Sequence, residues 1–199
     1  MADSRPAWSL FLDVLRGPRS AMAGVAARAN VREGRAAMIV LGVAHGAFSL
    51  LLYLSGHAPR FGVPGLDRSR HYLLQAIFAV PLFLVLWWVG GSVAHAVARR
   101  VTPPGGEDKR AASLAVFGVA YAVPMTLLFI VPDIAVHLAF GFSAIGKAMR
   151  YYAPLAALGC LALGTMGFSR AHHLSTRAAL LSAFAGFLVQ GILGSFFLR

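Results

Sequence analysis

The feature that most constrains this chain is an unbroken apolar stretch from Leu73 to Ala98, LLQAIFAVPLFLVLWWVGGSVAHAVA. It carries no formal charge over 26 residues and is followed directly by Arg99 and Arg100. An α-helix needs roughly 20 mostly apolar residues to cross the hydrocarbon core of a bilayer. The stretch is therefore long enough to span a membrane, which a soluble core in a chain of 199 residues would not require.

The composition of the whole chain agrees with a membrane location. Hydrophobic residues make up 58% of the sequence and charged residues 13%, about half the charged share of a typical soluble domain. The net charge of +11 could suggest nucleic-acid binding, but the 18 basic residues lie in short segments between apolar runs. Cations gathered in loops are typical of membrane proteins, so we expect a lipid bilayer as partner and no nucleic acid.

Four further apolar runs predict additional membrane helices. The sequence thus predicts an all-α polytopic membrane protein, a five-helix transmembrane bundle over residues 36–199, with spans at about 36–55, 73–98, 111–131, 151–168 and 178–198. Pro132 and Asp133 are expected to close the third span. The next apolar run, 134–146, has only 13 residues, so we expect an interfacial or re-entrant helix there.

Residues 1–35 are predicted to form a cytoplasmic segment with a short amphipathic helix that ends at Gly17-Pro18. The spacing of one helical face is shared by Trp8, Phe11, Leu12 and Leu15. This helix either lies in the membrane interface or packs on the end of the bundle. Nearer the first span, one helical face is predicted for Arg28, Arg32 and Arg35, which either bind lipid head groups or simply flank the span.

The distribution of basic residues predicts the orientation. Twelve Lys and Arg lie in the segments 1–35, 99–110 and 169–177, whereas six lie on the opposite side. Because cytoplasmic loops carry the excess of Lys and Arg, we expect a cytoplasmic N-terminus. Usage rich in Ala, Arg and Gly favours a bacterial protein and thus the cell inner membrane.

The candidate site residue within the spans is His45, near the middle of the first span. An ionisable group there is costly and is a functional candidate, as a proton relay, a ligand contact or a metal ligand. The alternative is a neutral imidazole bonded to another helix, with Gln75, Gln190 or a serine as partner. His95 is expected at the interface, and His172-His173 are expected to be solvated turn residues rather than a metal pair.

Small and polar residues recur at helical spacing in every span except the third and predict tight helix packing. They are Gly42, His45, Gly46 and Ser49; Gly91, Ser92 and His95; Ala156, Cys160, Gly164 and Gly167; and Ser182, Gly186 and Gln190. In addition, Pro81 and Pro124 interrupt the second and third spans and are predicted to kink them.

Enzyme motifs are absent from the sequence. There is no H-E-x-x-H, G-x-S-x-G or G-x-x-x-x-G-K-[ST] pattern, and none of the seven carboxylates is expected within a span. We therefore predict a protein that is not an enzyme, with no cofactor and no metal site.

Three segments together resemble a known family. They are WWVGGSVAHAVARR at the end of the second span, GVAYAVPMTLLFIVP in the third and GFSRAHHLSTRAALLSAFAGFLV leading into the last. With the short N-terminal helix, this pattern resembles the Yip family of Rab-interacting-type integral membrane proteins, especially its small prokaryotic members. The resemblance implies five spans and a cytoplasmic N-terminus. It also implies Rab binding in the eukaryotic relatives, but the cytosolic segment here, about 35 residues, lacks their long tail.

Two functions are consistent with these features. The first is a non-enzymatic Yip-type protein that organises or binds membrane partners or lipids, other membrane proteins or copies of itself. The alternative is a small transporter, or a membrane subunit of a transport complex, with a path near His45 between helices kinked at Pro81 and Pro124.

Overall fold

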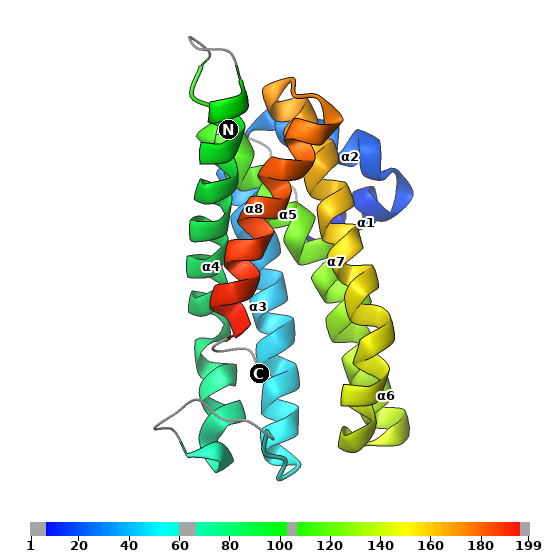
Figure 1. The fold of residues 1–199 in the computed structure, drawn as a ribbon. Coiled ribbons are helices and arrows are strands. Elements are labelled where there is room, and N and C mark those ends of the chain that lie inside the picture. Colours follow the sequence, from blue (N-terminus) through cyan, green and yellow to red (C-terminus); the bar gives the residue numbers. More distant parts are fainter. Residues whose placement is uncertain (1–6, 60–66, 103–106, 196–199) are drawn as a thin grey trace.

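A computed structural model describes residues 7–59, 67–102 and 107–195 of the chain. Within these ranges the structure is helical, with no strand, and five helices are long and apolar enough to cross a membrane. The prediction of an all-α polytopic bundle is therefore confirmed (Figure 1). We conclude that the chain is an integral membrane protein.

Two short helices precede the bundle, α1 (Ala7–Arg16) and α2 (Pro18–Arg28). The five candidate spans are α3 (Val31–Leu54); the 3-10 turn η1 (Arg68–Arg70) with α4 (His71–Val101); α5 (Arg110–Met125) with the π-helical turn η2 (Thr126–Ile130) and α6 (Val131–Phe140); α7 (Phe142–His172); and α8 (Thr176–Ser195).

The third span continues past the proline that was predicted to end it. Pro132 lies in the first turn of α6, and α5, η2 and α6 form one stretch of 31 residues from Arg110 to Phe140. A helix within lipid stays hydrogen-bonded because exposed backbone groups find no water there, and the π-helical turn accommodates the proline. The chain turns instead at Gly141, whose φ of 80° is a conformation that favours glycine.

The predicted separate helix at 134–146 is consequently wrong. Its residues are divided between the end of α6 and the start of α7. The predicted limits of the fourth span are also too short, because α7 runs over 31 residues from Phe142 to His172. Lys147 and Arg150 lie within this helix, exposed near its first turns. Charges close to a helix end are tolerated because long side chains reach the membrane surface.

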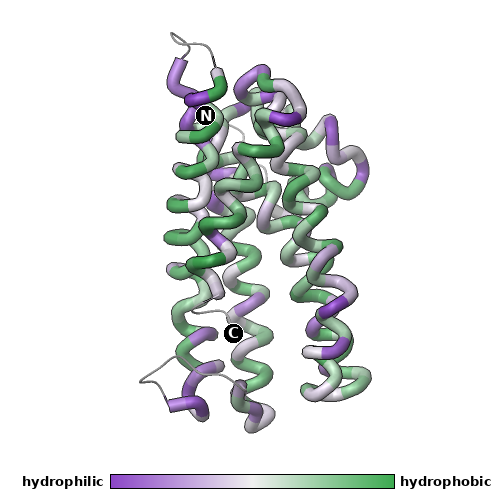
Figure 2. Tube along the Cα trace, in the orientation of Figure 1, coloured by the Kyte–Doolittle hydropathy of each residue, from purple (hydrophilic) through white to green (hydrophobic). Residues whose placement is uncertain are grey.

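The helices alternate in direction, so that their ends fall at two opposite ends of the molecule (Figure 1). One end, which we call the basic end, carries α1 and α2, the start of α3, the end of α4, the start of α5 and the α7–α8 turn. The other end carries the end of α3, the start of α4 and the turn at Gly141. Figure 2 shows apolar residues along the helices and most polar residues towards these two ends. The described parts of the segments predicted to share a side therefore do lie together.

Helix α1 packs on the bundle and also presents apolar side chains outward. Leu10, Phe11 and Val14 are buried in the main core, whereas the exposed fractions of Trp8, Leu12 and Leu15 are 64%, 38% and 63%. The apolar face predicted from the spacing is thus divided, because Phe11 points inward and its three partners do not.

Glycines bring the helix backbones into contact, as the small-residue pattern predicts. A Cβ atom added at Gly186 of α8 would lie 2.6 Å from the Gly90 carbonyl oxygen of α4, and one at Gly42 of α3 would lie 2.9 Å from the Val80 Cα. The third span was predicted to lack such a feature, but it has one at Gly118. A Cβ atom there would lie 2.6 Å from the Cα of Gly34 in α3.

We expect the substitution Gly118→Ala to destabilise the protein, because the methyl group would push the α3 and α5 backbones apart. Overpacking of this kind costs about 1–3 kcal/mol in the free energy of unfolding. A thiol-reactive dye can measure the loss, since Cys160 is the single cysteine of the chain and is 3% exposed.

The matched control is Gly146→Ala in α7, where an added Cβ would meet no atom within 4 Å. It should leave stability unchanged or raise it by up to about 1 kcal/mol, because alanine is the better helix former. Equal unfolding temperatures for the two variants would show that the α3–α5 contact is not tight.

Candidate functional site

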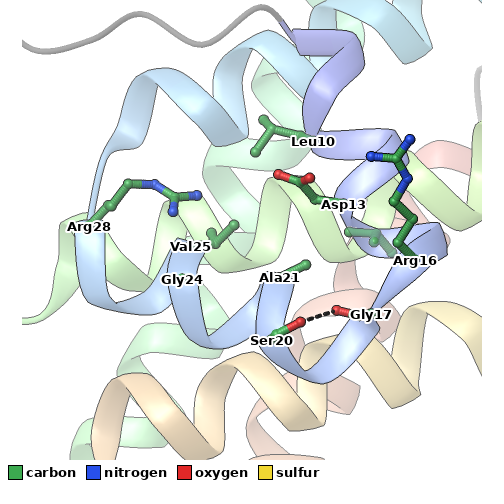
Figure 3. Close-up of a pocket in the computed structure, with 10 residues that line it drawn as sticks. Leu10, Asp13, Arg16, Gly17, Ser20, Ala21, Gly24, Val25 and Arg28 are labelled. Carbon is green, nitrogen blue, oxygen red and sulfur yellow. Dashed lines mark hydrogen bonds between the residues drawn. The ribbon is translucent and has the colours of Figure 1, made fainter.

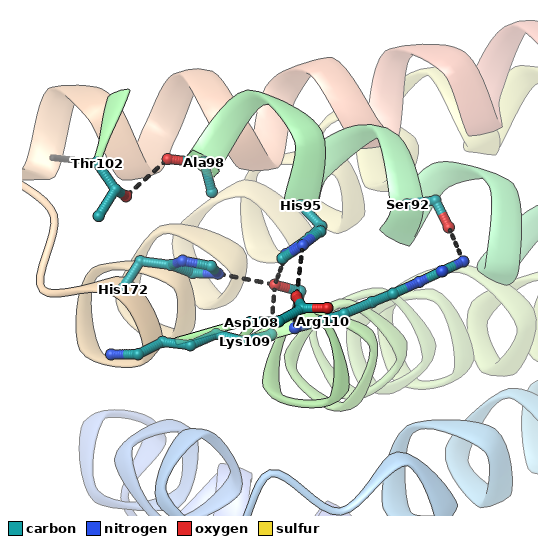
Figure 4. A network of polar contacts seen from close by, with 9 residues as sticks. Ser92, His95, Ala98, Thr102, Asp108, Lys109, Arg110 and His172 are labelled. Atoms are coloured by element: carbon teal, nitrogen blue, oxygen red, sulfur yellow. Dashed lines mark hydrogen bonds and ion pairs between the residues drawn. The ribbon is translucent and has the colours of Figure 1, made fainter. Parts of the chain in front are cut away.

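A network of buried polar side chains joins three helices at the basic end (Figure 4). The Oγ of Ser113, on α5, lies 3.0 Å from the Nδ1 of His95 on α4 and 2.8 Å from the Nε2 of His172 on α7. The Nε2 of His95 also lies 3.1 Å from a carboxylate oxygen of Asp108. The side chains of Ser113, His95 and His172 are all buried, and Ser113 is 0% exposed.

The chemistry of these groups limits where their protons lie. The Asp108 carboxylate accepts only, so the His95 Nε2 must carry the proton that they share. The hydroxyl of Ser113 has one proton and lies between two imidazoles and the Lys109 carbonyl oxygen, at 3.1 Å. With a neutral His95, Ser113 donates to its Nδ1 and accepts from the Nε2–H of His172. In this arrangement each of these contacts joins a donor to an acceptor. The one formal charge in the network is that of the Asp108 carboxylate, which is exposed.

Further contacts reinforce the same junction between α4 and α5. The Trp87 indole N–H donates to the Leu114 carbonyl oxygen at 2.9 Å. The Arg110 guanidinium lies 5.6 Å from the ring centre of Trp88, a cation–π distance. Arg110 also donates to the Ser92 hydroxyl at 3.4 Å.

The prediction for His172 is wrong, because it was expected in a solvated turn and its exposed fraction is 5%. His95, expected at the membrane interface, is 8% exposed and lies near the end of α4. His172 is the last residue of α7, whereas His173 follows it in a left-handed conformation and is exposed. The sequence did contain a signal: His95 lies near the end of the second predicted span, His172 lies in the turn after the fourth, and both are predicted on the same side.

The order carboxylate, imidazole and hydroxyl resembles the triad of serine hydrolases. In such enzymes the hydroxyl must reach a substrate carbonyl. Here the Ser113 hydroxyl is covered completely and is shared with a second imidazole. The arrangement therefore links α4, α5 and α7 through hydrogen bonds. Among the described residues, no group of three or more His, Cys, Asp or Glu side chains could hold a metal ion.

A second polar place is a cavity of about 260 Å³ among α3, α4, α5, η2 and α8. It is lined by two of the predicted site residues, His45 and Gln190, which are 6% and 1% exposed. The His45 ring packs edge-on against Phe83 at 5.5 Å. The third predicted residue, Gln75, does not line the cavity and accepts a hydrogen bond from the Ser49 hydroxyl at 2.9 Å. The predicted polar cluster is thus brought together only in part.

The third candidate site is a buried carboxylate, Asp133, that the sequence analysis did not identify as a site residue. Asp133 was expected at the end of the third span, but it lies within that span and is 0% exposed. The Tyr152 hydroxyl of α7 donates a hydrogen bond to it. The misplaced end of the third span explains the error, because a span that closes at Pro132 excludes the residue after it.

The predicted lipid-binding arginines do not share one helical face. Helix α2 ends at Arg28, Ala29 takes a left-handed conformation with φ 49°, and Asn30 caps the start of α3. The Arg28 guanidinium holds the Glu33 carboxylate through bonds of 2.6 and 3.0 Å, and this hydrogen bonding raises the pKa of Arg28. Arg32 and Arg35 lie exposed on α3.

A pocket of about 310 Å³ lies between α1 and α2 (Figure 3). Its charged lining residues are Asp13, Arg16 and Arg28. Because Asp13 is present and Arg28 is paired with Glu33, the charges of this pocket are largely compensated. It therefore offers no strong site for an anion.

Comparison with known proteins gives no similarity that could decide the family. No family model, no curated protein and no solved structure matches this chain. The resemblance to the Yip family thus depends on the sequence motifs alone.

We expect Ser113→Ala to loosen the basic end, because it leaves the His95 Nδ1 and the His172 Nε2 without their shared partner. An unsatisfied buried polar group costs about 1–3 kcal/mol. Thermal unfolding followed at Cys160 would measure this loss. Ser92→Ala is the control, because its contact with Arg110 is long and exposed, and its effect should stay within about 0.5 kcal/mol. Equal losses of stability in the two variants would show that Ser113 does not hold the three helices together.

Proposed function

We propose that this chain is a non-enzymatic membrane protein of the Yip type that binds anionic lipids at its basic end and organises the membrane around it. The observation that carries this proposal is the pairing of an outward apolar face on α1 with exposed arginines at the same end. The sequence motifs support the Yip type, and the buried Ser113 supports a non-enzymatic role.

The outward face of α1 suits the boundary between head groups and acyl chains. Trp8, Leu12 and Leu15 follow each other at helical spacing and are exposed although the same helix is anchored through Phe11 and Val14. Tryptophan is enriched at membrane interfaces because its ring is apolar and its N–H is polar. Held against the bundle, this face reaches surrounding lipid without any movement of the helix.

The exposed cations at the same end provide the attraction to anionic head groups. Arg19 of α2 and Arg32 and Arg35 of α3 are exposed, and Arg99 and Arg100 close α4 nearby in the fold. Each Lys or Arg near an anionic surface contributes about 1 kcal/mol to binding. Arg28 contributes less to this attraction because Glu33 neutralises it.

We expect the triple substitution Arg19→Gln, Arg32→Gln and Arg35→Gln to weaken anionic lipid binding by up to roughly 3 kcal/mol, about a hundredfold in affinity. Native mass spectrometry of protein from nanodiscs of mixed phosphatidylcholine and phosphatidylglycerol would count the phosphatidylglycerol molecules retained.

The control removes three exposed cations from the opposite end, through Arg68→Gln, Lys147→Gln and Arg150→Gln. It changes the net charge equally and should retain phosphatidylglycerol as the unmodified protein does. Equal losses in both triple variants would show that only net charge matters and would contradict a lipid site at the basic end.

A second candidate function, transport, is favoured by Asp133. Ionisable residues within membrane spans mark proton and ion pathways in many transporters, and Asp133 is a fully buried carboxylate with Tyr152 as its hydrogen-bond donor. The alternative reading is a structural bond between α6 and α7. The two interpretations differ in whether the function of the protein requires Asp133 to gain and lose a proton.

If Asp133 carries protons, Asp133→Asn should abolish proton flux while it preserves the fold, because the Asn carbonyl still accepts from Tyr152. The measurement uses proteoliposomes that contain a pH-sensitive dye. A potassium diffusion potential drives proton flux into them, and the dye reports it. Asp67→Asn, at an exposed residue outside the spans, should leave the flux unchanged. Wild-type flux equal to that of protein-free liposomes would exclude this candidate.

A further inference from the structure

The cavity beside His45 lies deep in the apolar part of the bundle, away from the basic end. His45 and Gln190 each come 14 residues after the first residue of their helices, which both start at the basic end. At 1.5 Å per residue, both side chains originate about 21 Å along the helix axes. The cavity therefore lies at the depth of acyl chains in a protein that spans the bilayer.

Gln190 is the polar group that distinguishes this cavity from a packing defect. Its side chain is 1% exposed, and neither its amide nitrogen nor its amide oxygen has a hydrogen bond of normal geometry. The Tyr121 hydroxyl lies close enough to interact with it, but leaves hydrogen-bonding capacity over. Buried amides are otherwise satisfied in folded proteins, and the cost of leaving one unsatisfied is higher in lipid than near water.

The lining of the cavity restricts the chemistry of a ligand that could satisfy Gln190. Most of the lining side chains are apolar, including Leu41, Phe83 and Ile130, and none carries a fixed formal charge. A charged ligand group would therefore be uncompensated. The amide offers N–H donors and one carbonyl acceptor, so the complementary group is neutral and combines a hydroxyl with a carbonyl.

The size and the opening of the cavity indicate how such a ligand would enter. A volume of about 260 Å³ is below the roughly 300–1,000 Å³ of sites that enclose a drug-sized molecule, so only the polar end of a lipid fits inside. Gly191 lines the cavity, is exposed, and would carry a Cβ atom in open space. Its position offers an opening through which an acyl chain can extend into the surrounding bilayer.

We propose that this cavity binds the polar end of a neutral acylglycerol, a mono- or diacylglycerol, through Gln190, with the acyl chain leaving beside Gly191. The glycerol hydroxyl would donate to the Gln190 carbonyl, and the ester carbonyl would accept from its N–H. The site is independent of the anionic lipid binding proposed for the basic end.

The test uses the full chain in phosphatidylcholine nanodiscs with a diacylglycerol that carries a photoreactive diazirine in one acyl chain. After illumination, digestion and mass spectrometry locate the labelled residues. We expect label concentrated near the cavity mouth, displaced by unlabelled diacylglycerol, whereas a phosphatidylcholine probe with the same chain labels the lipid-facing surface evenly. Label that is equally distributed for both probes, or is displaced equally by a quinone, would overturn the proposal.

Two variants separate ligand binding from folding. Gln190→Leu keeps the approximate volume and removes both hydrogen-bonding functions, and it should reduce the displaceable label roughly tenfold or more. Its unfolding temperature should not fall, because an apolar residue suits an apolar cavity. Retained label in Gln190→Leu would overturn the proposal, as would a lower unfolding temperature with unchanged label.

Gly191→Leu places a side chain in the opening, and Gly146→Leu is its matched control in α7, where an added Cβ also meets no atom within 4 Å. We expect the displaceable label to be lost in Gly191→Leu and unchanged in Gly146→Leu. Equal labelling of the two variants would show that the opening lies elsewhere and would contradict the proposed route. If a variant fails to fold, the displacement experiment on the unmodified protein still tests whether the cavity binds diacylglycerol.

Discussion

The close approach of the α3 and α5 backbones at Gly34 and Gly118 is the contact on which the rest of the bundle depends. Helices in lipid gain little from burying apolar side chains, because lipid is equally apolar, and associate through packing and polar contacts. With no Cβ atom at either position, α5 lies directly against α3 and becomes the central helix. Every residue from 112 to 120 is buried as a result. The other spans and the α1–α2 hairpin are arranged around it.

A buried central helix requires its polar groups to find partners on its neighbours, and the basic end shows how this is done. Ser113 faces both α4 and α7, so one hydroxyl satisfies two imidazoles. Because a polar group without a partner is costly in this environment, the network specifies which helices meet α5 and at what depth. Small residues permit close packing of helices, but they do not by themselves select the register.

The number of membrane-spanning helices could be predicted from the sequence because hydrophobic length is a strong local signal. The limits of the third span could not, because proline was read as a helix end. In water that reading is often right. In lipid the backbone remains hydrogen-bonded through a local π-helical turn, and the glycine at 141 ends the helix. This single difference moved Asp133 from a predicted span end to a position within the span.

The site residues were harder to predict because partners in a bundle are distant in sequence. His45 and Gln190 were recognised as costly polar residues within single helices, and that reasoning applies to each residue alone. His95, Ser113 and His172 become a site only when three helix ends are aligned, at separations of 18 and 59 residues. The sequence analysis places His172 in a solvated turn, which is the commoner outcome for a polar residue between two spans.

The two buried polar regions differ in how completely their hydrogen bonds are made within the protein. At the basic end Ser113 is hydrogen-bonded to neighbouring helices, so this buried network offers no free group to a ligand, and the anionic lipids proposed above would meet the exposed arginines instead. At the cavity, Gln190 keeps hydrogen-bonding capacity that the described residues do not use. The Ser113 hydroxyl has three hydrogen-bonding neighbours at one end, whereas the Gln190 amide has only the nearby Tyr121 hydroxyl in the middle of the bundle. This contrast favours a ligand at the cavity over imperfect packing.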